Sequence, residues 1–496
     1  MMKHHRKKSY SVTIILLLVA LQGSMLLSAA KPQTTQSCQR EVPLLVSDDW
    51  PMFHHDIVHS GYSTSVAPRT NHILWSTKIS DLFVDSSPAI VDGRVYISTP
   101  DGKLVCLNES NGEILWQFQT GRIIDYCSPA VVDGRVYIGS GDAKLYCLDA
   151  VNGSELWTFE TLYQREITCS PIVTNGKVYV GCWDAVMYCI DAENGSLLWY
   201  RGTNGYMEMN SVAVANGKIY FGSSADKLHC WNAENGSIIW ERTLRAFFSS
   251  PAIADGKLYV GALSSNNNVC CFNAETGDSL WNYTMIQPTR SSPAVHDGRV
   301  YIGSLDTNVY CLDANTGHLI WSTATEDSVV SSPAVADGYV FIGGRDHSVY
   351  CFNAKNGTLV WTYETGDQIE SSPAVADGRV CIGSYDGYLY MFQDFTNLSL
   401  SITGGNGIHI AIDNKGIFNA SDVNVHIRVT GKFLRSINIT TDHPKELLIP
   451  GEGYVVDTAI LGFMPIKIIA SVSSSTADPV EITKHGFVFF FYIIVW

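Results

Sequence analysis

Three histidines and one aspartate lie close together near the start of the chain, at His54, His55, Asp56 and His59. Imidazole and carboxylate groups are common zinc ligands, so this cluster could hold a metal ion. Adjacent side chains on a strand point to opposite faces, however, which makes His54 and His55 a poor pair for one ion. We therefore expect no metal site here and interpret the segment as one that packs over the rest of the fold.

Thiol chemistry is the second candidate, because the chain contains 13 cysteines. Such a number in an exported protein normally suggests disulfides. Seven of them recur at one place in successive repeats, which puts their sulfurs in separate sheets, and we expect them to act as small buried hydrophobic groups. These seven are Cys106, Cys147, Cys189, Cys230, Cys271, Cys311 and Cys351. Cys127 and Cys169 share another repeated place, where a bridge stays open as an alternative.

Carboxylates also recur with the same period, after the second strand of seven of the expected repeats. Aspartate is favoured in turns because its side chain accepts hydrogen bonds from nearby backbone, so we expect a structural role. The positions are Asp101, Asp142, Asp184, Asp226, Asp306, Asp346 and Asp386. From these three groups of residues we predict no catalytic set.

Composition limits the function classes. The chain has 496 residues, of which 46% are hydrophobic and 16% charged, as in a well-packed globular protein. Its formal net charge is −15. Phosphate binding needs a basic surface, so a nucleic-acid partner is not expected.

The first 30 residues have the layout of a secretory signal peptide. Basic residues are followed by the apolar stretch 12–27 and by the small residues Ser28, Ala29 and Ala30. An uncleaved membrane anchor is the alternative. We predict a signal peptide at 1–30, a linker at 31–49, and a secreted or cell-surface protein that is extracytoplasmic.

Internal repeats are the main signal for the fold. Eight tryptophans recur every 40 to 42 residues, and so does the tetrad S-S-P-A with its variants. Within residues 291–321, short apolar segments alternate with turn residues such as Asp297-Gly298, which predicts four hairpin-connected strands. Four-stranded repeats of this length are typical of propeller blades. The tryptophans are Trp75, Trp116, Trp157, Trp199, Trp240, Trp281, Trp321 and Trp361.

The order of these signals predicts how the ring closes. Trp75 precedes the first tetrad, and no periodic tryptophan follows the last tetrad at Ser371. The segment ILWSTKI around Trp75 should therefore supply the fourth strand of the last blade and leave no open sheet edge.

The sequences A-N-T-G-H-L-I-W at 314–321 and A-E-N-G-S-L-L-W at 192–199 resemble the repeat of the pyrroloquinoline-quinone (PQQ) enzyme family. The resemblance covers roughly Trp50 to Phe392. It implies an eight-bladed propeller at 50–394 in which the periodic tryptophans dock one blade against the next.

Quinoprotein dehydrogenases of this family hold PQQ and Ca²⁺ over the propeller axis. Their cofactor residues cannot be matched to positions in this chain, the blade spacing leaves little room for insertions, and no heme-attachment C-x-x-C-H occurs. Some quinoproteins carry a vicinal disulfide, but Cys270-Cys271 is better explained by a substitution within a strand. We expect no cofactor, and PQQ with Ca²⁺ is the alternative.

After the repeats the pattern changes to longer alternating strands. This part resembles Ig-like modules of exported proteins, and we predict an all-β chain with a small Ig-like β-sandwich at 395–480. A hydrophobic tail at 481–496 ends in GFVFFFYIIVW, which is too short to span a bilayer as a helix. We expect a final buried strand, with a shallow membrane or partner contact as the alternative.

Variation between repeats indicates which propeller face binds. The Asp-Gly and Asn-Gly turns lie on one face and hardly vary, whereas the opposite face carries variable connections between blades; we call this the variable face. Loops on a rigid scaffold often carry function, so we predict a protein or surface polymer bound there, and a PQQ- or metal-dependent oxidoreductase as the alternative. The predicted contact residues are Asp85, Asp125, Tyr126, Glu166, Met207, Glu208, Met209, Phe247, Phe248, Arg290 and Glu370.

Overall fold

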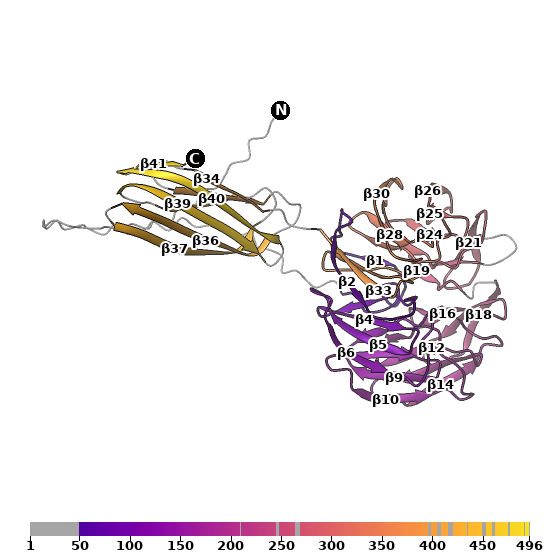
Figure 1. The fold of residues 1–496 in the computed structure, drawn as a ribbon. Coiled ribbons are helices and arrows are strands. Elements are labelled where there is room, and N and C mark those ends of the chain that lie inside the picture. The colour runs from indigo at the N-terminus through magenta and orange to yellow at the C-terminus, as the bar shows by residue number, and fades with distance from the viewer. Residues whose placement is uncertain are drawn as a thin grey trace, which may run out of the picture. The chain divides into compact units, whose positions relative to one another are not determined.

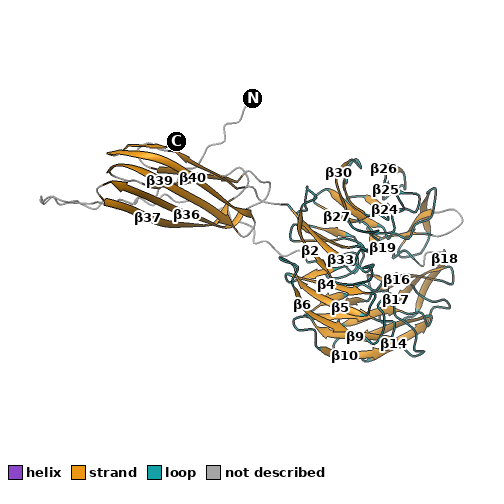
Figure 2. Ribbon diagram, viewed as in Figure 1, coloured by secondary structure: helices purple, strands orange, loops and turns teal. Residues whose placement is uncertain are grey.

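The computed structural model describes residues 49–208, 210–244, 248–262 and 268–394, and the strands between 398 and 495. The chain divides into two compact units, with one boundary between Gln393 and Asp394. The signal peptide predicted at 1–30 and the linker up to residue 48 lie outside the described residues. Figure 2 shows that the described elements are strands joined by turns and loops.

The first unit is a ring of eight four-stranded antiparallel blades, which confirms the predicted propeller (Figure 1). Blades 1 to 4 contain β3(Ala89–Val91), β4(Arg94–Thr99), β5(Lys103–Asn108) and β6(Ile114–Gln119); β7(Ala130–Val132), β8(Arg135–Gly139), β9(Lys144–Asp149) and β10(Glu155–Glu160); β11(Ile172–Thr174), β12(Lys177–Gly181), β13(Val186–Asp191) and β14(Leu197–Gly202); and β15(Ala213–Ala215), β16(Lys218–Ser223), β17(Lys227–Asn232) and β18(Ile238–Thr243).

Blades 5 to 8 repeat the same plan. They contain β19(Ala252–Ala254), β20(Lys257–Gly261), β21(Asn268–Asn273) and β22(Ser279–Thr284); β23(Ala294–His296), β24(Arg299–Gly303), β25(Asn308–Asp313) and β26(Leu319–Ala324); β27(Ala334–Ala336), β28(Tyr339–Gly343), β29(Ser348–Asn353) and β30(Leu359–Glu364); and β31(Ala374–Ala376), β32(Arg379–Gly383), β33(Tyr388–Gln393) and β2(Ile73–Lys78).

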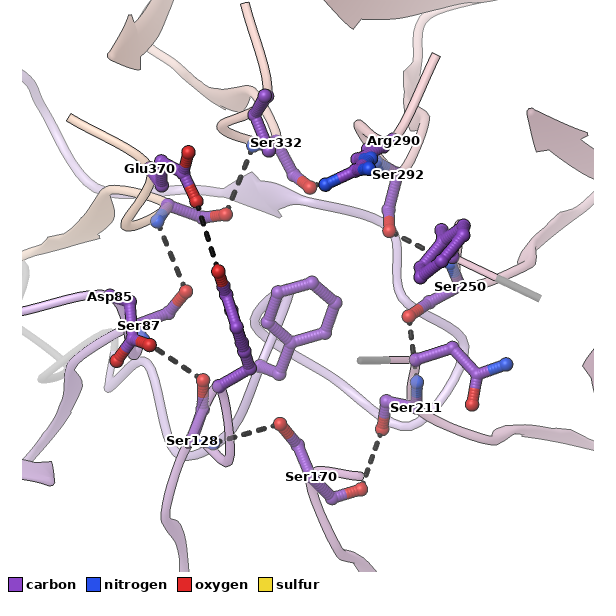
Figure 3. Close-up of a pocket in the computed structure, with 16 residues that line it drawn as sticks. Asp85, Ser87, Ser128, Ser170, Ser211, Ser250, Arg290, Ser292, Ser332 and Glu370 are labelled. Carbon is purple, nitrogen blue, oxygen red and sulfur yellow. Dashed lines mark hydrogen bonds between the residues drawn. The ribbon is translucent and has the colours of Figure 1, made fainter. Parts of the chain in front are cut away.

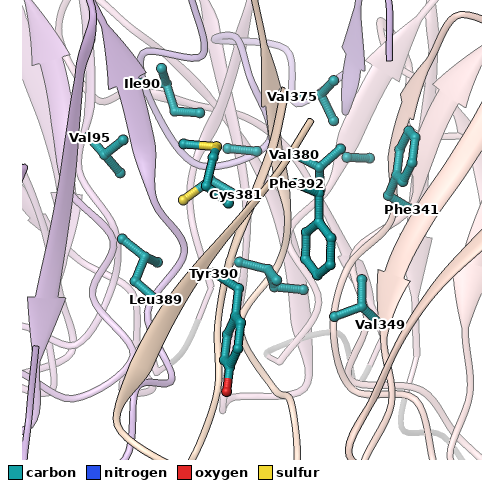
Figure 4. Close-up of a cluster of buried hydrophobic side chains, with 14 of the residues drawn as sticks. Ile90, Val95, Phe341, Val349, Val375, Val380, Cys381, Leu389, Tyr390 and Phe392 are labelled. Carbon is teal, nitrogen blue, oxygen red and sulfur yellow. The ribbon is translucent and has the colours of Figure 1, made fainter. Parts of the chain in front are cut away.

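Blade 8 closes the ring as the sequence predicted. Its outer strand β2 comes from the start of the propeller and pairs with β33, with Trp75 opposite Met391. A core cluster continues from blade 7 through blade 8 into blade 1, for example from Phe341 to Cys381 and Ile90 (Figure 4). The two ends of the propeller are therefore held together by strand pairing and by a shared core.

Each periodic tryptophan docks its blade on the next one, as expected. The indole Nε1 donates a hydrogen bond of 2.8–3.2 Å to a backbone carbonyl across the junction. At every junction but that of Trp361, the ring also packs against a turn glycine, as Trp281 does with Gly317. The carbonyls belong to Glu109 for Trp75, Ala150 for Trp116, Ala192 for Trp157, Ala233 for Trp199, Ala274 for Trp240, Ala314 for Trp281, Ala354 for Trp321 and Pro68 for Trp361.

The recurrent aspartates stabilise turns, in agreement with the structural role expected for them. In blade 6, Asp306 accepts hydrogen bonds from the backbone N–H of Asn308 and from the Tyr310 hydroxyl. Asp142, Asp184, Asp346 and Asp386 accept from tyrosine hydroxyls in the same way.

The cysteines of the described propeller are buried and free. Cys127 and Cys169 are not bridged: the Cys127 thiol instead contacts the Cys169 carbonyl at 3.2 Å. Cys270 and Cys271 are successive residues of β21 and are also free. Burial raises the pKa of both thiols to about 12, which keeps them protonated and unreactive.

A segment at 50–65, which we call the strap, runs around the face that carries the Asp-Gly turns. It includes the short strand β1(Tyr62–Ser63), which pairs in parallel with β27. Its backbone also bonds to the inner strands of other blades, through Ile90, Val131, Val214, Ile253, Val295 and Val335. The histidine cluster lies in this strap, so the segment packs over the propeller as interpreted from the sequence.

Burial lowers the pKa of His54 to about 3 and that of His59 to about 4, so both are neutral at physiological pH. The ring of His59 is hydrogen-bonded to the Pro251 carbonyl at 3.0 Å. Across the described residues, no group of three or more His, Cys, Asp or Glu side chains is arranged to hold a metal ion.

The second unit contains two antiparallel sheets. One has the strands β34(Leu398–Thr403), β35(Ile408–Asn414) and β38(Gly453–Thr458), and the other has β36(Ala420–Phe433), β37(Arg435–Leu448), β39(Gly462–Ser474), β40(Ala477–Phe490) and β41(Tyr492–Val495). The predicted boundary at 480 falls inside β40. The hydrophobic tail predicted at 481–496 therefore forms part of this sheet, through β40 and β41. The Ig-like assignment stays a prediction. No helix in the described part of the chain is long and apolar enough to cross a membrane.

Candidate functional site

A ring of eight serines surrounds the propeller axis (Figure 3). Each is the second residue of a tetrad and lies two residues before the inner strand of its blade. At seven junctions the backbone N–H of one serine donates to the Oγ of the next at 2.8–3.1 Å, and at the eighth the Ser211 Oγ donates to the Ser170 carbonyl. The serines are Ser87, Ser128, Ser170, Ser211, Ser250, Ser292, Ser332 and Ser372.

The first tetrad residue acts inside its own blade. The Oγ of Ser291 accepts a hydrogen bond from the N–H of Gly303 at the end of the second strand, and Ser331 and Ser371 do the same with Gly343 and Gly383. The second tetrad position joins blade to blade around the whole ring. The first fixes its own blade and also contacts the next one at some junctions, where for example the Ser371 Oγ donates to the Ser86 carbonyl at 2.8 Å. This hydrogen-bonded ring is a rigid frame for the side chains that line the propeller axis.

An axial cavity opens above this ring on the variable face and has a volume of about 60 Å³. Phe53 of the strap lines it, together with the residue that immediately precedes the tetrad in six of the blades. This preceding position differs from blade to blade, unlike the serines beside it. The six residues are Asp85, Tyr126, Phe248, Arg290, Val330 and Glu370.

Glu370 is the best-satisfied carboxylate of the cavity. It forms an ion pair with Arg345 and accepts a 2.9 Å hydrogen bond from the Tyr385 hydroxyl. The Tyr126 hydroxyl approaches the same carboxylate at 3.4 Å (Figure 3). Although Glu370 is buried, its charge is therefore compensated within the protein.

Asp85 has the opposite environment. Asp85 is 5% exposed, and no group among the described residues donates a hydrogen bond of normal geometry to either carboxyl oxygen. Burial and the neighbouring Asp125 carboxyl raise the pKa of Asp85 well above its usual 3.8. Burial also raises the pKa of Asp125, and Glu166 and Glu370 add to that shift. Two carboxyl groups in contact share a proton more readily than both ionise.

Tyr126 is held in an unusual backbone conformation beside this pair. Its φ is 56°, a region that bulky residues rarely adopt. In blade 2, as in blade 4, one more residue separates the buried side chain of the connection from the tetrad: Ile124 lies three residues before its tetrad, whereas Ile167 and Val329 lie two residues before theirs. Tyr126, at the end of this longer segment, lines the axial cavity.

Arg290 and Phe248 form the opposite wall of the cavity. The guanidinium lies over the Phe248 ring, 5.0 Å from its centroid. Arg290 also lies near enough to Glu208 to lower the pKa of that carboxyl, although burial, the larger effect, raises it. The cavity thus has a cationic and aromatic side facing an acidic one.

The structure brings together five of the predicted contact residues at the cavity: Asp85, Tyr126, Phe248, Arg290 and Glu370. Three more belong to the surrounding variable face. Asp125 contacts Asp85, Glu166 forms an ion pair with Arg122 at 3.2 Å, and Glu208 is half-buried.

Three predicted residues do not contribute a described contact surface. Met207 is fully buried against Gly181 and belongs to the packing beneath this face. Met209 and Phe247 lie outside the described residues.

Sequence reasoning missed the serine ring, Phe53, Arg345, Tyr385 and the stacked pair Trp183–Tyr206, whose ring centroids are 4.7 Å apart. Aligning the eight repeats could have shown that one variable position precedes a constant serine in each blade. No sequence signal points to Phe53, because its place depends on the path of the strap around the axis.

Comparisons with known proteins agree with this architecture. A family profile described as "Outer membrane protein assembly factor BamB" matches residues 57–124, 127–211, 207–292 and 265–391. The chain is similar to the crystal structure of BamB from Moraxella catarrhalis, with 18% identity, a TM-score of 0.55, and coverage of 65% of this chain and 99% of that one.

Two oxidoreductase structures are also similar. The quinohemoprotein alcohol dehydrogenase from Comamonas testosteroni has 15% identity, a TM-score of 0.61, and coverage of 70% of this chain and 80% of that one. A europium-containing methanol dehydrogenase has 13% identity, a TM-score of 0.57, and coverage of 75% and 91%. No curated protein sequence matches the chain. At these identities the structures show the shared fold alone.

Proposed function

The chain belongs to the repeat family described as outer membrane protein assembly factor BamB, and from that premise we propose that it is an extracytoplasmic scaffold that binds a protein partner on its variable face. The signal-peptide layout predicted from the sequence supports export. The observation that carries the proposal is the axial cavity, where variable side chains converge on a frame that is constant in every blade. A surface polymer is the alternative partner.

The cavity fits PQQ poorly. Small-molecule sites usually have volumes of about 300 Å³ or more, against about 60 Å³ here. PQQ is a planar tricyclic acid with three carboxyl groups, and the cavity would set these against Asp85 and Glu370, with Asp125 close behind. We therefore derive no step through a quinone and favour binding over dehydrogenation.

A site-specific photocrosslink tests where the partner binds. A benzoylphenylalanine placed at Phe248, expressed in cells of the source organism, should give a discrete adduct with a partner protein. The matched control replaces Glu275, whose side chain is 72% exposed in a turn of the opposite face, and should give no such adduct. Equal adducts from both positions would contradict the proposal that the partner binds to the variable face.

Calorimetric titration with PQQ and Ca²⁺ tests the oxidoreductase alternative. We expect no saturable heat from the folded chain. Tight saturable binding would contradict the scaffold proposal and would require a search for alcohol substrates.

A further inference from the structure

On the acidic side of the axial cavity, Asp85, which lines it, and Asp125, whose carboxyl contacts that of Asp85, both lack a cationic partner. Among the ion pairs of the described residues, Arg345 compensates Glu370 and Arg122 compensates Glu166, whereas none involves Asp85 or Asp125. Arg290 lines the cavity but lies over Phe248. Among the described residues, the Asp125 carboxyl is the titratable group that acts on Asp85, and Glu166 and Glu370 act in turn on Asp125.

Neither carboxyl oxygen of the buried Asp85 accepts a hydrogen bond of normal geometry from the described residues. Removing a carboxylate from water without hydrogen bonds or a counter-charge is strongly unfavourable, and the fold retains this one at the wall of a cavity. In the free protein a shared proton reduces this cost. A donor that carries its own positive charge would satisfy both carboxylates and release that proton to solvent.

The dimensions of the cavity select the kind of donor. About 60 Å³ accommodates the end of one side chain and no large ligand. Phe53, Tyr126 and Phe248 add aromatic surface, and aromatic faces attract cations. Asp125, Tyr126, Phe248 and Arg290 are each half-buried, so the site is reachable from solvent on the variable face.

We propose that this cavity receives the ammonium or guanidinium end of a lysine or arginine side chain from the protein partner, held between Asp85 and Asp125. The inference rests on the proposed function and specifies the chemistry of the partner. The ring of serines keeps the two carboxyl groups in place, while Tyr126 and Phe248 flank the bound side chain.

The test uses the full chain and four small probes: N-acetyl-lysine methylamide, N-acetyl-arginine methylamide, and their neutral counterparts built on norleucine and citrulline. Ligand-observed NMR titration should show saturable binding of the cationic probes and none of the neutral ones. Calorimetry of the cationic probes in two buffers of different ionisation enthalpy should show net proton release on binding.

Matched variants connect the binding to the named residues. Asp85→Asn should weaken the cationic probes at least tenfold, and Asp125→Asn should abolish proton release. Asp81→Asn is the control, because Asp81 lies in the same connection but is 95% exposed and paired with Lys78; it should change neither. Thermal unfolding shows that each variant is folded.

Equal binding of neutral and cationic probes, or equal affinities of Asp85→Asn and Asp81→Asn, would overturn the inference. A crosslink at Phe248 would leave the scaffold proposal standing in that case. Probe binding that depends on Asp85, without any crosslink at Phe248, would instead support the cation site and remove the protein partner from that face.

Discussion

At the scale of single residues, one position in each blade determines the character of the axis. The residue before each tetrad is aspartate in blade 1, tyrosine in blade 2, arginine in blade 6 and glutamate in blade 8. The neighbouring serine is the same throughout and is held by backbone hydrogen bonds. The ring of serines is thus a rigid and constant frame. The residue before each tetrad can change without changing the structure of the blade.

Asp85 makes stability depend on pH in a direction that can be measured. Its pKa is higher in the folded protein than in the unfolded chain. Above about pH 4 the unfolded chain therefore loses its proton first, and stability falls with rising pH until the folded carboxyl also ionises. Each unit by which the pKa is raised removes about 1.4 kcal/mol.

Asp85→Asn should remove this penalty, so its melting temperature relative to the original protein should rise between pH 4 and pH 7. Asp81→Asn should show no such rise, since the Lys78 ammonium lowers the pKa of that exposed carboxyl. A flat difference for Asp85→Asn across this range would show that the folded pKa is not raised.

At the scale of elements, the repeated hairpins explain which predictions from sequence succeeded. Tetrads, Asp-Gly turns and periodic tryptophans are local signals of strand and turn, and they located the blades and the closing strand around Trp75. The variable face was predicted from the same local comparison. The contacts of that face depend on other blades: Arg345 reaches Glu370 from a turn of blade 7, and Phe53 reaches the axis from the strap.

Met207 is a predicted contact residue that the structure places in the buried packing instead. It was predicted to offer contact area because its connection differs from the others. Its burial follows from the place it takes over Gly181, which Val329 takes over Gly303 in blade 6. Met207 lies three residues before its tetrad and Val329 two before its own, because blades 2 and 4 carry one residue more between the buried side chain and the tetrad. Counting back from each tetrad therefore does not align the two residues.

The docking of tryptophan on glycine gives a prediction with an internal control. Gly317 and Gly298 both have positive φ, at 72° and 68°, so alanine costs about 1–2 kcal/mol at either position. A methyl group at Gly317 would lie 2.6 Å from the Trp281 ring, whereas at Gly298 it meets nothing within 4 Å.

Gly317→Ala should therefore destabilise the protein by about 1–3 kcal/mol more than Gly298→Ala, through overpacking at the junction between blades. Denaturant unfolding of the two variants measures the difference. Equal losses would mean that the Trp281 ring can move aside at no cost, and that the indole contributes little to blade docking.

At the scale of the whole molecule, the ring is closed without a covalent bond. β2 joins β33 by strand pairing and by the core that blades 7, 8 and 1 share. An ion pair of 2.8 Å between Arg379 of blade 8 and the buried Glu109 of blade 1 reinforces the same junction. Every other blade is continuous in sequence, so separation of β2 is the one opening that exposes a sheet edge without first breaking a hairpin.

A pair of engineered disulfides tests whether closure governs stability. Ser76 lies opposite Tyr390 across β2 and β33, and Ser322 lies opposite Tyr310 across β26 and β25, at the same register and with the same residue types. Replacing either pair by cysteines removes equivalent contacts, since both tyrosines donate to a turn aspartate. The two bridges differ in the length of chain that they enclose.

Because loop entropy grows with that length, the bridge between positions 76 and 390 should stabilise the oxidised protein by about 3 kcal/mol more than the bridge between 310 and 322. Denaturant unfolding of oxidised and reduced forms of both variants gives the two values, and mass spectrometry checks that the bridges have formed. Equal stabilisation by the two bridges would show that the unfolded chain keeps its ends together, or that the ring opens elsewhere than at β2. The larger effect at 76 and 390 would establish the pairing of β2 with β33 as the closure on which the eight-bladed ring depends.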